Sequence, residues 1–204
     1  MKKLNIKQVL TEGINIGIKN IVSLIAATIL YVVTVWIPYL NVGTTIAMCS
    51  IPVELSKGKI ISPVFIFNSK YRKNIGEFFI LVGLQAMAMI PAFLMGIIPG
   101  IVLSYAWSLA IYLFIDKDIH ALDALRKSNE FTYGNKWRMF FIGIILGIAM
   151  SILTTIFGLI PAVGAILNIV VMLLFIPIQM GCKAVIYRQL TTPEETSVEE
   201  VKAE

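Results

Sequence analysis

Charged residues are missing from three long stretches of this 204-residue chain. No Asp, Glu, Lys or Arg occurs in residues 20–53, 78–115 or 139–182. With 58% hydrophobic residues, 14% charged residues and a mean hydropathy of +0.86, the composition is typical of a membrane protein and not of a soluble domain. Because ionisable groups buried in a membrane usually mark proton or ion pathways, their absence from these stretches argues against ion-coupled transport.

Signatures of catalysis and metal binding are also scarce. The sequence has no HExxH, Walker A, GxSxG or GxGxxG motif, so we expect no enzymatic activity and no cofactor. Its two cysteines, Cys49 and Cys182, have no CxxC or Cys/His spacing that would indicate a metal site or a disulfide framework. Asp116, His120 and Asp123 would share one face of a helix, which makes a weak metal site conceivable, but we interpret them as surface charge next to basic neighbours and expect no metal site.

Each uncharged stretch is long and contains residues that favour a turn. A membrane crossing needs roughly 20 apolar residues and no fewer than about 17, so each stretch has room for two crossings. Near the middle of each lie residues that favour a turn, because proline lacks a backbone donor and glycine tolerates unusual φ angles. The turns are predicted at Pro38, at Pro99 with Gly100, and at Pro161.

The positions of the basic residues predict how the chain is oriented. Lys and Arg form four clusters between the uncharged stretches and are absent from the three predicted turns. All four clusters lie on the cytoplasmic side, as short basic loops do, if each stretch is a hairpin; they alternate sides if each is one helix. We therefore predict an all-α polytopic integral membrane protein with six transmembrane helices in three helical hairpins, N-in/C-in. The helices are expected at 20–37, 42–54, 77–96, 101–115, 138–159 and 164–182.

Several features refine this prediction. The second helix is short enough to tilt little, thin the bilayer or re-enter. Residues 1–190 are predicted to form the membrane domain, and the glutamate-rich residues 191–204 an acidic disordered cytoplasmic tail.

The three predicted hairpins begin with similar sequences, GIKNI, YRKNI and YGNKW, which suggest copies of one hairpin unit, with chance similarity as the alternative. Two amphipathic stripes indicate interfacial segments or solvated connecting helices. The first stripe consists of Ile6, Val9, Leu10 and Ile14, and the second of Ile119, Leu122 and Leu125.

Polar and small residues inside the stretches carry two further predictions. Gln85, Asn168 and Gln179 are candidates for a narrow polar path, although interhelical hydrogen bonds are the commoner use of such residues. Gly143, Gly147, Ser151 and Thr155 recur at every fourth position, which predicts a helix-packing seam. Whether such a seam would join helices of one chain or of two is left open.

Basic and aromatic residues gather where the fifth predicted helix begins. Arg126, Lys127, Lys136 and Arg138 lie near Trp137. Each basic residue close to an anionic leaflet contributes about 1 kcal/mol of attraction, and tryptophan favours the headgroup level. These five residues are therefore candidates for lipid-headgroup contact. Since the basic residues of the chain flank apolar stretches and form no single patch, nucleic acid is not expected as a partner.

Residues 99–141, PGIVLSYAWSLAIYLFIDKDIHALDALRKSNEFTYGNKWRMFF, carry a family resemblance. Their Pro-Gly turn, aromatic-Ser-Leu-Ala stretch, DALRKS helix and GNKWR entry resemble a bacterial membrane group. It includes YciC-like proteins and the membrane domain of some glycerophosphoryl diester phosphodiesterases. The resemblance implies the six-helix fold and a multi-pass location in the cytoplasmic (inner) membrane. It implies no catalytic residue, because catalysis in those relatives belongs to a separate soluble domain.

Together these observations predict a non-catalytic membrane protein. We expect it to act through membrane lipids, anionic ones in particular, or through a partner membrane protein or a second copy of itself. A passive channel or transporter for a small or amphipathic solute, lined by Gln85, Asn168 and Gln179, is the alternative.

Overall fold

The computed structural model describes residues 3–160 and 163–192, and within these ranges the chain forms helices and no strand. The α-helices are α1 (Ile6–Lys19), α2 (Ile21–Thr34), α3 (Leu40–Ser56), α4 (Ile75–Met95), α5 (Ile97–Ala106), α6 (Ala110–Lys117), α7 (Ala121–Thr132), α8 (Lys136–Gly158) and α9 (Gly164–Thr191), with two 3-10 helices, η1 (Pro63–Phe67) and η2 (Ser69–Arg72). The predicted tail and the predicted turn at Pro161 lie largely or wholly outside the described residues.

Several of these helices are long and apolar enough to cross a membrane. They are α4, α8, α9 and the segment Ile97–Lys117 that contains α5 and α6; α1 and α2 together make a fifth candidate that is bent by 73°. The α3 helix has 17 residues and therefore spans about 25 Å, less than the roughly 30 Å of a hydrocarbon core. The described helices thus offer four spans, or five with the bent pair, where the sequence predicted six.

The turn predicted at Pro99 and Gly100 lies elsewhere. The chain reverses at Gly96, whose φ of 148° is open only to glycine. Pro99 and Gly100 both belong to α5. Pro99 fits the first turn of a helix because its missing N–H would have no intrahelical partner there. Gly100 lets Phe93 of α4 lie against α5, since a Cβ at this position would come within 2.3 Å of the Phe93 ring. Pro38 lies in the turn between α2 and α3.

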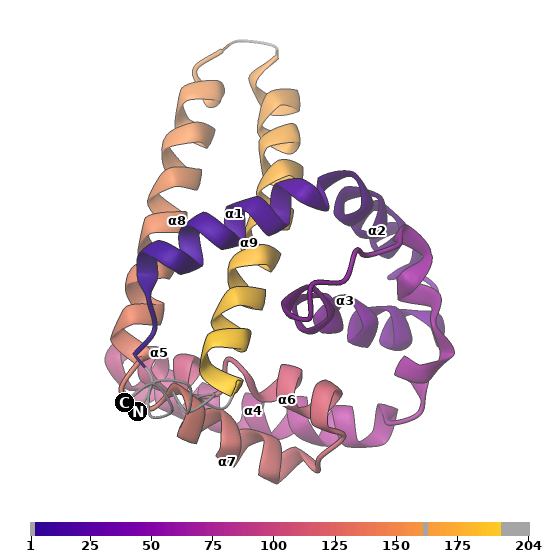
Figure 1. Cartoon of the computed structure of the whole chain (residues 1–204), viewed down its shortest axis with the longest axis vertical. Helices are drawn as coiled ribbons and strands as arrows, with labels where there is room; N and C mark the ends of the chain where they lie inside the picture. The colour runs from indigo at the N-terminus through magenta and orange to yellow at the C-terminus, as the bar shows by residue number, and fades with distance from the viewer. Residues whose placement is uncertain (1–2, 161–162, 193–204) are drawn as a thin grey trace, which may run out of the picture.

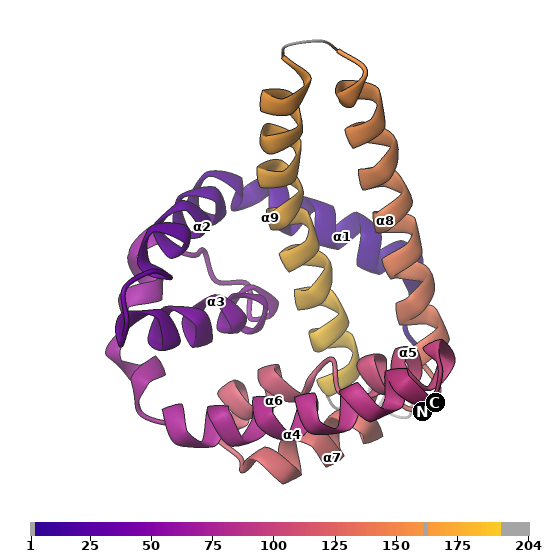
Figure 2. The ribbon, with the colours of Figure 1, turned by 180° about the vertical axis from the view of Figure 1, so that it is seen from behind.

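The N-terminal helix packs far more tightly than its amphipathic stripe predicts. Helix α1 crosses α9 at Gly13 and Gly17, and both glycines are buried. An added Cβ at Gly13 would stand 2.7 Å from the Cα of Cys182, and one at Gly17 would stand 2.7 Å from the carbonyl oxygen of Pro177. Figures 1 and 2 both show α1 lying across α9 and α8. Backbone-to-backbone contact of this kind uses small residues because larger ones keep helices apart.

The α7 helix closes the end of α5. The buried Ser128 hydroxyl donates to the carbonyl of Ala106 (2.7 Å) and accepts from the N–H of Leu109 (3.2 Å), while Thr132 donates to the same carbonyl. These bonds satisfy backbone groups that the end of α5 leaves unpaired. Of the predicted amphipathic stripe, Leu125 is buried but Leu122 is 69% exposed, and the other buried residues of α7 are the small Ala121, Ala124, Ser128 and Thr132.

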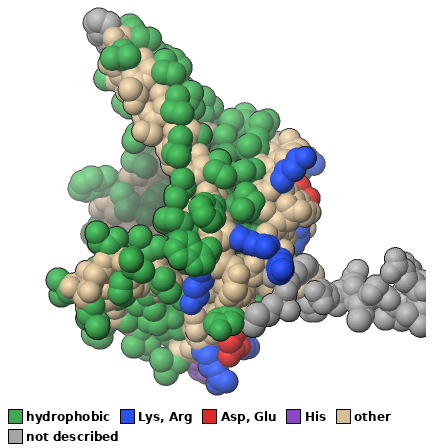
Figure 3. Space-filling view, turned by 90° about the vertical axis from the view of Figure 1, so that its left-hand side faces the viewer, with side chains coloured by type: hydrophobic (Ala, Val, Ile, Leu, Met, Phe, Trp, Pro, Cys, Tyr) green, Lys and Arg blue, Asp and Glu red, His purple; other side chains and the backbone are tan. Residues whose placement is uncertain are grey.

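Charge and apolar surface occupy different parts of the molecule. The α8–α9 pair projects from the other helices, which form a ring in this view (Figure 1). Hydrophobic side chains cover the projecting part, whereas lysines, arginines and acidic residues gather on the opposite side (Figure 3). The turn residues Trp36 and Met95 are both 84% exposed. Large apolar surfaces of this extent mark a membrane-facing region rather than a surface in contact with water.

Candidate functional site

The predicted headgroup residues separate into two groups. At the start of α8, Lys136 donates to the side-chain oxygen of Asn129 (2.9 Å), and Trp137 stacks edge-on against Phe140 with 5.8 Å between ring centroids. Arg138 instead donates to the carbonyl of Leu4 (2.9 Å) and so fixes the N-terminal segment. On α7, Arg126 pairs with Glu130 while Lys127 is exposed. Lys136 and Trp137 are therefore the two that share a site.

That site is an apolar groove between α5 and α8. It has a volume of about 310 Å³. Ile98, Ile101 and Val102 of α5 line one side, Phe140 the other, and Tyr105 lies between them. Tyr133, Gly134, Lys136 and Trp137 close one end. The groove thus places a cation and an indole at the end of an apolar surface.

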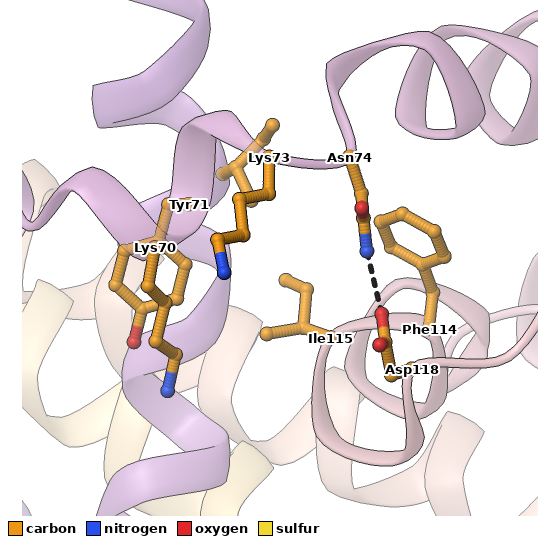
Figure 4. A pocket seen from close by; sticks show the side chains of 8 residues that line it. Lys70, Tyr71, Lys73, Asn74, Phe114, Ile115 and Asp118 are labelled. Atoms are coloured by element: carbon orange, nitrogen blue, oxygen red, sulfur yellow. Dashed lines mark hydrogen bonds between the residues drawn. The ribbon is translucent and has the colours of Figure 1, made fainter.

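A second pocket lies among the basic residues near η2 (Figure 4). It holds about 340 Å³, and Lys73 points into it while the Asn74 amide donates to Asp118 (2.5 Å). Its other cation, Lys70, lies 3.8 Å from the Glu54 carboxylate and 5.1 Å from the centre of the Tyr71 ring. Burial raises the pKa of the Tyr71 phenol, which therefore stays neutral. Because Lys70 already faces a carboxylate, Lys73 is the main cation that this pocket offers to an anion.

Two poorly exposed carboxylates form an ionic cluster that joins three helices. Glu54 of α3 lies 2.5 Å from the ammonium of Lys59, and Asp116 of α6 lies 2.5 Å from that of Lys57. The Tyr187 hydroxyl of α9 donates to the other Asp116 oxygen (2.6 Å). The exposed fractions of the Glu54 and Asp116 side chains are 8% and 10%. Carboxylates so shielded need such partners, so the cluster holds α3, α6 and α9 together.

The metal interpretation of Asp116, His120 and Asp123 is wrong. Helix α6 ends at Lys117, Asp118 takes a left-handed conformation with φ of 50°, and α7 begins after His120. The three side chains therefore do not share one helical face. Among the described residues no group of three or more His, Cys, Asp or Glu is placed to hold a metal ion.

The three residues of the predicted polar path do not line one cavity. Gln179 lines a cavity of about 290 Å³ between α5–α6 and α8–α9, but Gln85 and Asn168 are not among its lining residues. The Gln85 amide donates to the carbonyl of Trp107 (3.2 Å), which is an interhelical hydrogen bond. Asn168 lies near Gly158 at the far end of the α8–α9 pair.

The small residues of α8 do not form the predicted packing seam within this chain. A Cβ added at Gly147 would meet nothing within 4 Å, and one at Gly143 would meet the Tyr105 hydroxyl. Ser151 is exposed. Both glycines line the Gln179 cavity, but only Gly147 leaves space there, because Gly143 lets the Tyr105 hydroxyl of α5 approach α8 closely.

No family model, curated protein or solved structure matches this chain. The resemblance to the YciC-like group therefore stays a prediction. Sequence reasoning missed Gly13, Gly17 and Gly181 at the α1–α9 crossing, although the Gly-xxx-Gly spacing in α1 is a signal for close helix packing. It also missed the Glu54–Asp116 cluster, because nothing in the sequence brings these two residues together.

Proposed function

We propose that the chain is a non-catalytic, multi-pass protein of a bacterial cytoplasmic membrane that binds anionic lipid. Its six helices cross as three hairpins, with both termini and the basic residues inside. The uncharged turns near Pro38, Gly96 and Pro161 lie outside. The separation of charge from apolar surface in Figure 3 supports a cytoplasmic place for the basic residues, since short loops rich in Lys and Arg stay in the cytoplasm. In Figures 1 and 2 α4 lies across the α8–α9 pair rather than along it, so the second hairpin has to turn relative to α8 and α9 in order to cross beside them. A short α3 can cross where the bilayer thins around it.

The observation that carries the lipid part of the proposal is the groove between α5 and α8. Its apolar walls suit an acyl chain, which gains free energy by close packing even within a bilayer. Its closed end presents Lys136 beside Trp137, at the start of a helix that follows a charged segment. A lysine ammonium at headgroup level attracts a phosphate, and a tryptophan indole favours the same depth.

We expect Lys136→Gln to reduce the affinity of the purified protein for phosphatidylglycerol about fivefold, since a lysine near an anionic headgroup contributes about 1 kcal/mol. Binding is measured by native mass spectrometry in a nonionic detergent. Lys127→Gln is the matched control because Lys127 is exposed and lies outside the groove. Equal losses in the two variants, or none in either, would contradict a specific groove.

A passive solute pathway is the competing function, and Gln179 is the predicted path residue that favours it because this residue lines a cavity. Flux of a small solute into liposomes that falls in Gln179→Leu, with lipid binding unchanged, would favour the pathway over lipid binding.

A further inference from the structure

Two cavities among the helices share a lysine. The first, of about 290 Å³, is the Gln179 cavity against α8; the second, of about 360 Å³, lies against α2 and α3. Ser108, Tyr112 and Lys183 line both. These volumes are at the small end of the range for ligand pockets, which is roughly 300–1,000 Å³.

Lys183 is placed deeper than the other basic residue of its helix. It is the first charged residue after the uncharged stretch 139–182, whereas Arg188 pairs with Glu12. Tyr187, which bonds Asp116 of the ionic cluster, lies four residues further along α9. At 1.5 Å per residue this places Lys183 about 6 Å deeper than Tyr187.

The Lys183 ammonium has no counter-charge in the described part of the chain. No carboxylate there lies within ion-pair distance, and it makes no hydrogen bond to a described residue. The side chain of Lys183 is exposed, and within a membrane a cation is costly unless an opposite charge or water meets it. Gln179 adds an amide that can donate to an anion, whereas the Ser108 hydroxyl on the same cavity wall already donates to the carbonyl of Tyr105 (2.9 Å).

The remainder of the first cavity is largely apolar, and Gly147 leaves space in it. Ile142, Leu146 and Ile186 line it together with Gly143 and Gly147. A side chain at Gly147 would enter empty space, since an added Cβ meets nothing within 4 Å. The cavity therefore runs from a cation on α9 to an open apolar surface on α8. One end suits an anion and the other a hydrocarbon chain.

We propose that this cavity binds a single-chain anionic lipid, with its phosphate or carboxylate at Lys183 and its chain along Leu146 and Gly147. The single chain follows from the small volume, and the negative head from the unpaired ammonium. This inference rests on the proposed membrane location, but it concerns a different site and a different lipid from the groove at Lys136. It also gives the predicted seam of small residues on α8 a ligand-binding role.

The test measures binding of lysophosphatidylglycerol to the purified full chain in nonionic detergent, by native mass spectrometry. Lys183→Gln is expected to weaken binding about fivefold, because a lysine near an anionic headgroup contributes about 1 kcal/mol of attraction, while Lys183→Arg retains it. Gly147→Leu fills the apolar end and is expected to weaken the same lipid. Thermal unfolding without lipid establishes that each variant is folded; should Gly147→Leu fail this check, the two Lys183 variants decide.

Three ligands separate the possible occupants. Lysophosphatidylcholine has a matching chain without net charge, and glycerol phosphate has the head without a chain. The proposal expects both to bind at least about tenfold more weakly than lysophosphatidylglycerol. Equal binding of lysophosphatidylcholine, tight binding of glycerol phosphate, or wild-type binding by Lys183→Gln would each overturn it.

Lys136→Gln separates this inference from the groove. If Lys136→Gln lowers phosphatidylglycerol binding and Lys183→Gln leaves lysophosphatidylglycerol binding unchanged, the cavity assignment is wrong and the groove stands. If Lys136→Gln leaves phosphatidylglycerol binding unchanged and Lys183→Gln lowers lysophosphatidylglycerol binding, the groove assignment is wrong and the cavity assignment is supported.

Discussion

Gly181→Ala is expected to destabilise the protein by about 3 kcal/mol or more and to release α1 from α9, although it adds only one methyl group. A Cβ at this position would stand 2.1 Å from the carbonyl oxygen of Gly13 and 2.9 Å from the amide nitrogen of Gly17. Both atoms belong to the backbone, so no side chain can rotate away to make room. The two helices must separate, and the buried contacts of Val9 and Cys182 in the core that they share are lost.

The matched control is Gly83→Ala, another glycine-to-alanine change inside a helix. An added Cβ at Gly83 meets nothing within 4 Å, and alanine is the better helix former, so stability should stay unchanged or rise slightly. Unfolding is followed by thermal denaturation in nonionic detergent. If Gly181→Ala unfolds at the same temperature as Gly83→Ala, the close α1–α9 crossing is contradicted.

Asp116→Ala is expected to cost about 2–3 kcal/mol, because hydrogen bonds to a charged group contribute more than neutral ones. The change leaves the Tyr187 hydroxyl without its acceptor and removes the nearest carboxylate from Lys57. The side chain of Lys57 is 43% exposed and can turn toward water, so we assign most of the loss to the contact between α6 and α9. Asp116→Asn keeps an acceptor for Tyr187 and should lose less.

Glu130→Ala is the control for this prediction. Glu130 forms an ion pair with Arg126, but both side chains are well exposed, at 59% and 79%. Exposed pairs contribute about 0–1 kcal/mol, so this change should have little effect on the unfolding temperature. A loss in Asp116→Ala no larger than that in Glu130→Ala would show that the cluster does not hold the helices together.

The sequence predicted the positions of the helices better than the turns and breaks between them. The uncharged stretches and their periodicity located α2, α4, α8 and α9 to within a few residues at most ends, because long apolar helices depend on local composition. The break between α5 and α6 was missed because Trp107, Ser108 and Leu109 are typical of an apolar helix, while the bonds of Ala106 and Leu109 to Ser128 of α7 depend on tertiary contacts. The turn moved from Pro99 to Gly96 because proline is compatible with the first turn of a helix.

The candidate site was less predictable, for a different physical reason. Polar side chains were taken as possible path residues, yet Gln85 uses its amide to join two helices. Gly143 and Gly147 were both taken as packing residues, yet only Gly143 receives a neighbouring side chain, whereas Gly147 leaves a cavity open. A residue type does not reveal whether the neighbouring helix approaches closely or stays away. Only the packing of α5–α6 against α8 and α9 decides that, and this packing is not local in sequence.

Cysteine accessibility in intact cells tests the membrane architecture most directly. Single cysteines replace Trp36, Met95 or Val163 at the uncharged turns, and Ser69 or Lys127 among the basic residues, in a chain carrying Cys49→Ser and Cys182→Ala. All five positions are exposed, whereas the nearby Ser128 is fully buried and would not react in either orientation. The account predicts that a membrane-impermeant thiol reagent labels the three turn positions in intact cells and the two basic positions only after lysis. Labelling at Ser69→Cys in intact cells, or none at Met95→Cys, would contradict it.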